Sequence, residues 1–268
     1  MQNINIDKGW MPDFIPFGMP EGGLVECKNL LPLDRHYAPA NNKAVYSTNA
    51  VTGTPLAAME FYDTAGQNYV FVGTTTKLYR LEINKSLTDI TKLSTTYTTG
   101  DNIWSFLQYG TWIVATNFQD NIQILKGLVT ANFIDLGGSP PKAKYLLFKN
   151  GHLILANLNE SGTLSPKKIL WSALEDIENF AESLTTGASS QDFPDADGDI
   201  TGMAGIGNSF GIFYKNSITI GWYSGAPFTF NFAVNKFKNV GALPNSVISI
   251  GDTAFFLNEK DAYALTQG

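Results

Sequence analysis

The chain has 268 residues, of which 44% are apolar, 13% aromatic and 16% charged. A soluble domain usually carries about 25% charged residues, and this apolar composition excludes a disordered polymer. The 25 glycines and 12 prolines are spread along the whole length, which excludes collagen-like and low-complexity classes. No window reaches the roughly 18 uninterrupted apolar residues of a membrane-spanning helix. Because no apolar stretch of a secretory signal follows the polar N-terminus, we expect a soluble protein made in the cytosol.

The formal net charge is −6, from 18 basic and 24 acidic side chains. Proteins that grip nucleic acid do so mainly through clustered Lys and Arg on phosphates, whereas the doublet Lys167-Lys168 is isolated here. We therefore expect no stable nucleic-acid complex and only weak affinity for duplex DNA at physiological salt. A mildly acidic surface instead permits a wall that DNA passes without sticking.

The first segment, residues 1–54, contains five prolines and differs in character from the rest. Proline at this density disfavours regular structure and predicts an extended arm or a wrapped loop. Trp10, Phe14 and Phe17 make this arm hydrophobic. Two interpretations stay open: the arm covers the outside of its own domain, or it packs on a neighbouring subunit, with these three residues as interface candidates.

Residues 55–268 consist of short segments rich in Val, Ile, Phe, Tyr and Thr, each closed by Gly, Asn, Asp or Pro. This pattern predicts β-strands. The predicted strands are 57–62, 69–73, 77–83, 104–109, 112–117, 122–125, 143–149, 152–158, 169–172, 203–206, 210–215, 217–223, 228–233, 246–250, 253–258 and 262–265. One helical turn is expected over 174–184, because its acidic residues lie early, where acids suit a helix N-terminus.

The predicted strands repeat one theme five times, starting at residues 57, 104, 145, 202 and 246. A strand turns at a small residue into a more hydrophobic strand, and further hairpin strands follow. Repeats of roughly 40 to 60 residues with about four strands each are typical of propeller blades. A jelly roll or two-sheet sandwich is the alternative, but its strands would alternate more cleanly between apolar and polar residues.

A four-stranded blade cannot bury both of its faces alone, so successive blades pack face to face around an axis. Segments such as 112–116 and 255–257 are almost continuously hydrophobic, as this packing requires. We therefore predict an all-β fold over residues 55–268, a β-propeller-like repeat of about four to five antiparallel blades whose last blade is incomplete. Either the arm supplies the missing strands, or the sequence is one portion of a longer product.

The residues that carry chemistry in other proteins are sparse here. Cys27 has no second cysteine for a disulfide and no companion for a metal site. His36 and His152 lie far apart, and we interpret both as ordinary loop or strand residues. The acidic stretch 192–199 lacks the Gly and Glu positions of an EF-hand loop, so we interpret it as a solvated turn between blades.

The remaining motifs lead to the same interpretation. The glycines of 202–207 match neither a dinucleotide fingerprint nor a Walker sequence, and predict a tightly packed inner strand. No Gly-x-Ser-x-Gly elbow occurs. Four tryptophans could stack against sugars, but we interpret them as packing residues: Trp104, Trp112, Trp171 and Trp222. We expect no catalytic residue, no cofactor and no metal, and a protein that is not an enzyme.

Several strings in the chain are familiar when they are taken in order. They are Trp10-Met11-Pro12-Asp13, the segment 17–22, Asn29-Leu30-Leu31-Pro32 with Tyr37, Trp104-Ser105-Phe106 with Gly110, Ala115-Thr116-Asn117, the segment 140–144, Trp171-Ser172-Ala173 and Gly225-Ala226-Pro227-Phe228. Together they resemble the tail hub or nozzle proteins of short-tailed bacteriophages and related prophages. The resemblance covers nearly the whole chain, and its motifs are packing and turn residues.

The resemblance implies a virion protein of the phage tail, a propeller-bearing subunit that usually assembles as a hexameric ring below the portal and adaptor. The ring encloses the channel for genome ejection. The implied partners are copies of itself, the adaptor or head-to-tail connector protein, and a tail fibre or spike, with transient lumenal DNA and no membrane insertion. Family members run on beyond this length, which leaves tip and fibre-docking roles open.

Two other functions stay open beside this one. A carbohydrate-binding or glycan-cleaving propeller is suggested by the tryptophans and the scattered carboxylates, although one sequence cannot show which carboxylates converge. A cellular propeller that serves as a scaffold for other proteins would share the fold and differ only in its partner.

Overall fold

The computed structural model describes residues 9–10, 23–24, 28, 30–32, 37–39, 45–100, 102–127 and 131–266. It divides the chain into two units, Met1–Tyr46 and Ser47–Gly268. In the first unit, β1 (Gly9–Trp10) pairs in parallel with β2 (Gly23–Leu24), and β3 (Leu30–Pro32) pairs antiparallel with β4 (Tyr37–Pro39). The side chain of Trp10 and the whole of Phe14 and Phe17 lie outside the described residues, as do Cys27 and His36.

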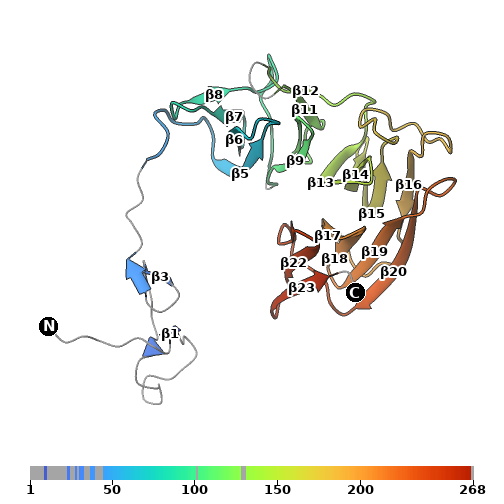
Figure 1. Ribbon diagram of the computed structural model, residues 1–268. Coiled ribbons are helices and arrows are strands. Elements are labelled where there is room, and N and C mark those ends of the chain that lie inside the picture. The colour runs from blue at the N-terminus through green and yellow to red at the C-terminus, as the bar shows by residue number, and fades with distance from the viewer. Residues whose placement is uncertain are drawn as a thin grey trace. The chain divides into compact units, whose positions relative to one another are not determined.

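The second unit consists of five antiparallel sheets that follow one another along the chain and stand in an arc (Figure 1). We number these sheets blades 1 to 5. Blade 1 is β5 (Pro55–Tyr62), β6 (Asn68–Thr74), β7 (Leu78–Leu81) and β8 (Leu87–Asp89); blade 2 is β9 (Ser105–Tyr109), β10 (Trp112–Thr116), β11 (Gln123–Lys126) and β12 (Ile134–Asp135). Blade 3 is β13 (Lys142–Lys149), β14 (His152–Glu160), β15 (Thr163–Trp171) and β16 (Ser189–Asp192). Blade 4 is β17 (Ile200–Ile206), β18 (Ser209–Tyr214), β19 (Ser217–Tyr223) and β20 (Phe230–Lys238), and blade 5 is β21 (Ile248–Ile250), β22 (Thr253–Leu257) and β23 (Ala262–Thr266).

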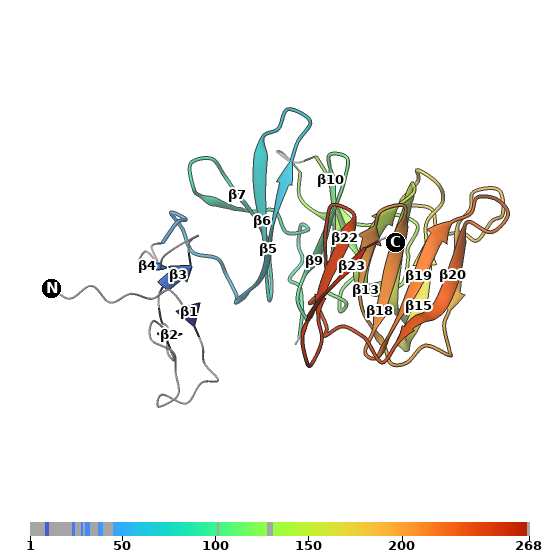
Figure 2. The same cartoon turned by 60° about the horizontal axis from the view of Figure 1, so that its bottom comes forward.

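Strands that are consecutive in the chain are neighbours in every blade, so each blade is a meander. The first strands of successive blades lie side by side, from β5 through β9, β13 and β17 to β21. Figure 2 shows blades 3 to 5 packed against one another. This arrangement confirms the predicted all-β, propeller-like fold, and the sandwich alternative is wrong.

The long apolar runs occur in blades 2 to 4 because neighbouring blades cover both faces of these sheets. In β14, the consecutive residues Leu153, Ile154 and Leu155 are all fully buried. Leu153 and Leu155 belong to the core between blades 2 and 3, whereas Ile154 belongs to the core between blades 3 and 4. Successive side chains of a strand point to opposite faces, so a doubly covered sheet needs apolar residues at every position.

The predicted helical turn over 174–184 is wrong, because the described part of the chain contains no helix. Backbone groups of this segment bond to distant partners instead: Leu174 N donates to Thr186 O at 3.0 Å, and Glu175 N donates to Gly151 O at 2.7 Å. Glu175 also has a positive φ of 55°, which a right-handed helix does not permit. Tertiary hydrogen bonds thus override the weak preference of acids for a helix start.

The short outer strands β8, β12 and β16 were not among the strands predicted from the sequence. These strands are two to four residues long, and much of their surface is exposed. They are fixed by pairing to a longer neighbour rather than by a hydrophobic period, so their sequences carry little strand signal.

Blade 1 approaches blade 2 closely at one glycine. A Cβ added to Gly73 in β6 would lie 2.3 Å from Cδ1 of Trp104, whereas one added to Gly205 in β17 would meet nothing closer than 3.8 Å. Neither residue has a positive φ. The space at Gly73 is therefore filled by the Trp104 indole, which is itself buried.

We expect Gly73→Ala to lower the free energy of unfolding by about 1–3 kcal/mol, because the new methyl displaces the Trp104 ring. The matched control Gly205→Ala, also inside a blade strand, should change it by no more than about 0.5 kcal/mol. Urea denaturation measures both variants. Equal losses would contradict the close contact between Gly73 and Trp104.

Candidate functional site

Three of the motifs that carry the resemblance lie at or next to the seams between blades. At the seam between blades 1 and 2, Trp104 is 3% exposed and its indole Nε1 donates to the backbone oxygen of Thr74 at 2.8 Å. The ring of Tyr97 meets it edge-on at 5.0 Å between centroids. The Trp104 ring and its hydrogen bond thus join the start of blade 2, just before β9, to the end of β6 in blade 1.

The next seam is closed by Ala115-Thr116-Asn117 and the segment 140–144. Thr116 Oγ1 donates to the backbone oxygen of Ala143 at 2.6 Å, from the end of β10 to the first strand of blade 3. Asn117 Oδ1 accepts hydrogen bonds from the backbone N–H groups of Gln119 and Asp120, which shapes the turn after β10. These motif residues therefore connect blades 2 and 3 and set the path of the chain between them.

At the end of blade 3, Trp171-Ser172-Ala173 ties the strand to the long segment that follows. Trp171 Nε1 donates to Gly187 O at 2.7 Å, and Ser172 Oγ accepts from the backbone N–H of Leu153 at 3.0 Å. Trp171 is only 5% exposed. Trp171 also meets the ring of Phe230 in blade 4 at 5.4 Å between centroids, so each of the three motifs has one side chain that contacts the neighbouring blade.

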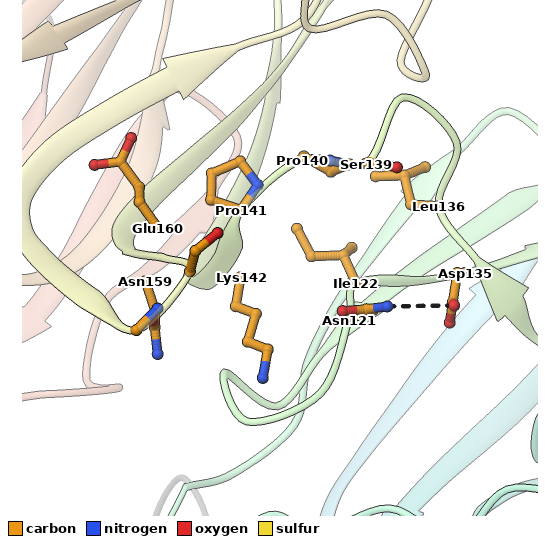
Figure 3. A pocket seen from close by; sticks show the side chains of 12 residues that line it. Asn121, Ile122, Asp135, Leu136, Ser139, Pro140, Pro141, Lys142, Asn159 and Glu160 are labelled. Carbon is orange, nitrogen blue, oxygen red and sulfur yellow. Dashed lines mark hydrogen bonds between the residues drawn. The ribbon is translucent and has the colours of Figure 1, made fainter.

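A polar hollow of about 630 Å³ opens between blades 2 and 3 (Figure 3). Its lining comes from the residues just before β11, from the stretch that runs from the end of β12 to the start of β13, and from the end of β14 with the turn after it: Asn121, Ile122, Asp135, Leu136, Ser139, Pro140, Pro141, Lys142, Asn159, Glu160, Ser161 and Gly162. Figure 3 shows the amide of Asn121 directed at the Asp135 carboxylate, and Glu160 on the opposite wall. Two carboxylates are thus the main titratable acids of the hollow.

The carboxylate of Asp135 is held by three donors. Lys92 Nζ lies 2.7 Å from Oδ2, Gln123 Nε2 lies 2.7 Å from Oδ1, and Asn121 Nδ2 lies 3.3 Å from Oδ2. Partial burial pushes the pKa of Asp135 upward, but these hydrogen bonds outweigh it and hold the pKa below its ordinary value. Tyr97 extends the network by donating to Gln123 Oε1 at 2.9 Å.

Glu160 is paired in the same way. Hydrogen bonds from Lys168 at 2.8 Å and Ser165 at 2.6 Å lower the pKa of Glu160, and partial burial opposes this shift more weakly. Both carboxylates are therefore ionised at neutral pH. A general acid needs a raised pKa, so neither of these two groups is suited to protonating a leaving group.

His152 begins β14, which confirms its interpretation as a strand residue. It is 1% exposed, and its Nδ1–H donates to the backbone oxygen of Ser172 at 2.7 Å. Burial lowers the pKa of His152, although the hydrogen bond to Ser172 and the charge of Glu175 oppose the shift. Phe230 meets the imidazole at 5.3 Å between ring centroids. The histidine is thus a neutral packing residue at the seam of blades 3 and 4.

Two further predicted features, the acidic stretch and the glycines of 202–207, lie where they were predicted from the sequence. The acidic stretch 192–199 joins β16 to β17 as a turn whose four aspartates are exposed, while Phe193 and Ala196 point into the core. Gly202 and Gly205 lie in β17, the first strand of blade 4. Among the described residues, no group of three His, Cys, Asp or Glu side chains could hold a metal ion, and no helix is long and apolar enough to cross a membrane.

The tryptophans divide into covered and uncovered ones. Trp104 and Trp171 are buried, and Trp112 packs against Tyr109 at 5.9 Å between rings. Trp222 in β19 is 39% exposed. Nothing in the sequence separates Trp222 from the others, because the difference arises from what covers its face of the blade.

No protein-family model matches the chain, and no curated protein matches it. Solved structures do match. Virginiamycin B lyase from Staphylococcus aureus has a TM-score of 0.50 and 11% identity, over 83% of this chain and 72% of the lyase chain. YCF48, solved bound to a D1 peptide, gives 0.49 and 11% over 87% and 68%, and AztD from Citrobacter koseri gives 0.47 and 12% over 85% and 63%. At such identities the likeness to the lyase shows the fold alone.

Acid should destabilise the fold through His152. Because the folded-state pKa is lowered, the unfolded chain binds more protons below about pH 6.5, so stability falls as the pH drops through that value toward the folded pKa. We expect His152→Gln to remove this part of the pH dependence. Chemical denaturation of both proteins between pH 7.5 and pH 5 tests the expectation, and parallel curves would contradict it.

Proposed function

We propose that the protein is a structural subunit of a phage tail, a hub or nozzle component that assembles into a ring and encloses a conduit for the genome. The proposal rests on the family resemblance along nearly the whole chain. It is supported by one observation of the fold: the motif residues Trp104, Thr116 and Trp171 each contact the neighbouring blade, the first two by a hydrogen bond and Trp171 through the ring of Phe230. A motif set that serves packing suits a protein whose function is its shape.

Two physical requirements of a conduit agree with the packing and the net charge of the protein. A wall that a duplex passes must keep its form and must not bind phosphate. Doubly buried sheets supply the first property, since close-packed cores deform little. The net charge of −6 favours the second, because phosphate contacts by clustered basic residues dominate affinity for DNA.

Electron microscopy tests the assembly directly. The purified protein is imaged alone and mixed with the adaptor protein of the same tail. We expect closed rings of several copies, which pack self-complementary or head-to-tail surfaces as symmetric oligomers do. A protein that stays monomeric in both samples and is absent from tails would contradict the proposal.

A glycan-binding propeller is the second candidate, and one hollow favours it. A cavity of about 440 Å³ lies between blades 3 and 4, with Phe228 exposed at its rim and Glu182, Ser190 and Gln191 among its lining residues. Aromatic faces beside polar groups are suited to sugars. Trp171 also lines the cavity, but it is buried and offers no open surface on which a sugar could stack.

A glycan array and a turnover assay separate the two candidates. On the second candidate, Phe228→Ala should abolish glycan binding, because the exposed ring is the stacking surface, while the control Leu164→Ala on β15 should leave it unchanged. If the unmodified protein shows neither binding nor cleavage, the glycan function is contradicted.

A further inference from the structure

A hollow of about 410 Å³ lies where blades 3 and 4 meet the link into blade 5, and we call it the seam pocket. Its walls come from β13 and β14 of blade 3, from the start of β17 and the end of β18 in blade 4, from the link 242–244 and from the turn after β22. Blades 3 and 4 both have four strands, so the pocket is not a strand position left open. It shares no lining residue with the cavity at Phe228.

Backbone groups hold the walls of the seam pocket in place. Ala242 N donates to Tyr214 O at 3.0 Å, which fixes the link against blade 4. On another wall, Asn157 Nδ2 donates to Ile200 O at 2.9 Å, from blade 3 to blade 4. The folded chain therefore forms the pocket before any ligand arrives, as is usual for small-molecule sites.

The strand β14 is irregular at the seam pocket. Its pairing with β15 shifts register between Ala156 and Leu158, and Asn157 between them has a positive φ of 57°. Lys144 and Tyr145 lie at the same level on the neighbouring strand β13. Bulges re-aim side chains and are over-represented next to active sites. The irregular backbone therefore coincides with the side chains that line the pocket.

Tyr145 is the residue that points to a ligand. Its side chain lines the pocket and is 7% exposed. Its hydroxyl has no hydrogen-bond partner among the described residues, and it is not sealed in the core as the hydroxyl of Tyr214 is. Burial raises the pKa of Tyr145, so the hydroxyl stays protonated at neutral pH and can donate. A buried donor without a partner is costly, and a ligand oxygen in the pocket removes that cost.

Charged side chains of both signs line the pocket with Tyr145. Lys144 is half-buried, whereas Asp199, Lys215 and Glu259 are exposed at the rim. None of these four forms an ion pair with a described residue. Unpaired charges of both signs in one pocket favour a ligand that carries both signs, because each charge of the ligand then meets an opposite one.

We propose that the seam pocket binds a small zwitterion of the amino-acid class. The carboxylate of the ligand lies at Lys144 and accepts a hydrogen bond from the Tyr145 hydroxyl, in the charge-assisted pairing that is strongest. Its ammonium group lies at the rim with Asp199 and Glu259, and its apolar part lies along the link 242–244. A volume of about 410 Å³ is within the range of small-molecule sites. The site does not depend on ring assembly and goes beyond the proposed function.

Calorimetric titration of the full chain with each of the twenty standard amino acids tests the ligand class. We expect at least one of them to saturate a single site. The carboxamide and the N-acetyl form of the tightest one should each bind at least about tenfold more weakly, because each lacks one charge-assisted hydrogen bond. Acetate and phosphate should also bind more weakly. No saturable binding by any of the twenty, or equal binding of the blocked forms, would overturn the proposal.

Two tyrosine variants test the deep end of the pocket. Tyr145→Phe should weaken binding about tenfold but leave the urea midpoint of the free protein unchanged, because the hydroxyl it removes has no partner among the described residues. Tyr97→Phe is the matched control, since its hydroxyl bonds to Gln123 at 2.9 Å outside the pocket. It should lower the urea midpoint and leave binding unchanged. Unchanged binding by Tyr145→Phe would show that the ligand does not lie at this hydroxyl.

Charge variants test how the ligand is oriented. Lys144→Gln should weaken binding of the tightest amino acid, and Lys238→Gln, exposed on β20 outside the pocket, should not. Glu259→Gln should weaken binding of the amino acid but not of its N-acetyl form, which has no ammonium group. Equal effects of Lys144→Gln and Lys238→Gln, or equal effects of Glu259→Gln on the two ligands, would contradict the proposed orientation.

Discussion

The need of each blade to have its faces covered by neighbouring blades is the constraint on which the rest of the structure depends, and blades 2 to 4 are covered on both faces. A single meander of four strands has two broad faces and cannot cover either one by itself. Stacking along the chain covers them, as the opposite destinations of Leu153 and Ile154 in β14 show. Gly73 and the Trp104 indole fit together at one seam for the same reason.

The constraint also explains where the fold remains open. In blade 5, Ala254 and Phe256 face blade 4 and are buried, whereas Phe255 and Leu257 of the same strand are exposed. The exposed residues have the apolar character of covered ones, so this surface is chemically a blade interface.

Inner strands could be predicted from the sequence because a strand that is covered on both faces needs a continuous apolar run, as β14 has. The outer strands could not be predicted in this way. Asp135 in β12 is held by hydrogen bonds from Lys92 and Gln123, and no pattern in the residues next to Asp135 indicates these partners. The helix predicted over 174–184 is absent because acids near Glu175 favour a helix start only weakly, and tertiary hydrogen bonds of the segment outweigh this preference. Trp171 and Trp222 look alike in the sequence, since their difference lies in a distant strand.

Amide hydrogen exchange on the native protein tests the central claim most directly. β14 and β22 are both paired on two sides within their sheets, but β14 is covered on both faces and β22 on one. If double burial holds the fold together, the amides of β14 exchange much more slowly than those of β22, because opening them exposes more apolar surface. Equal protection of the two strands would contradict the account.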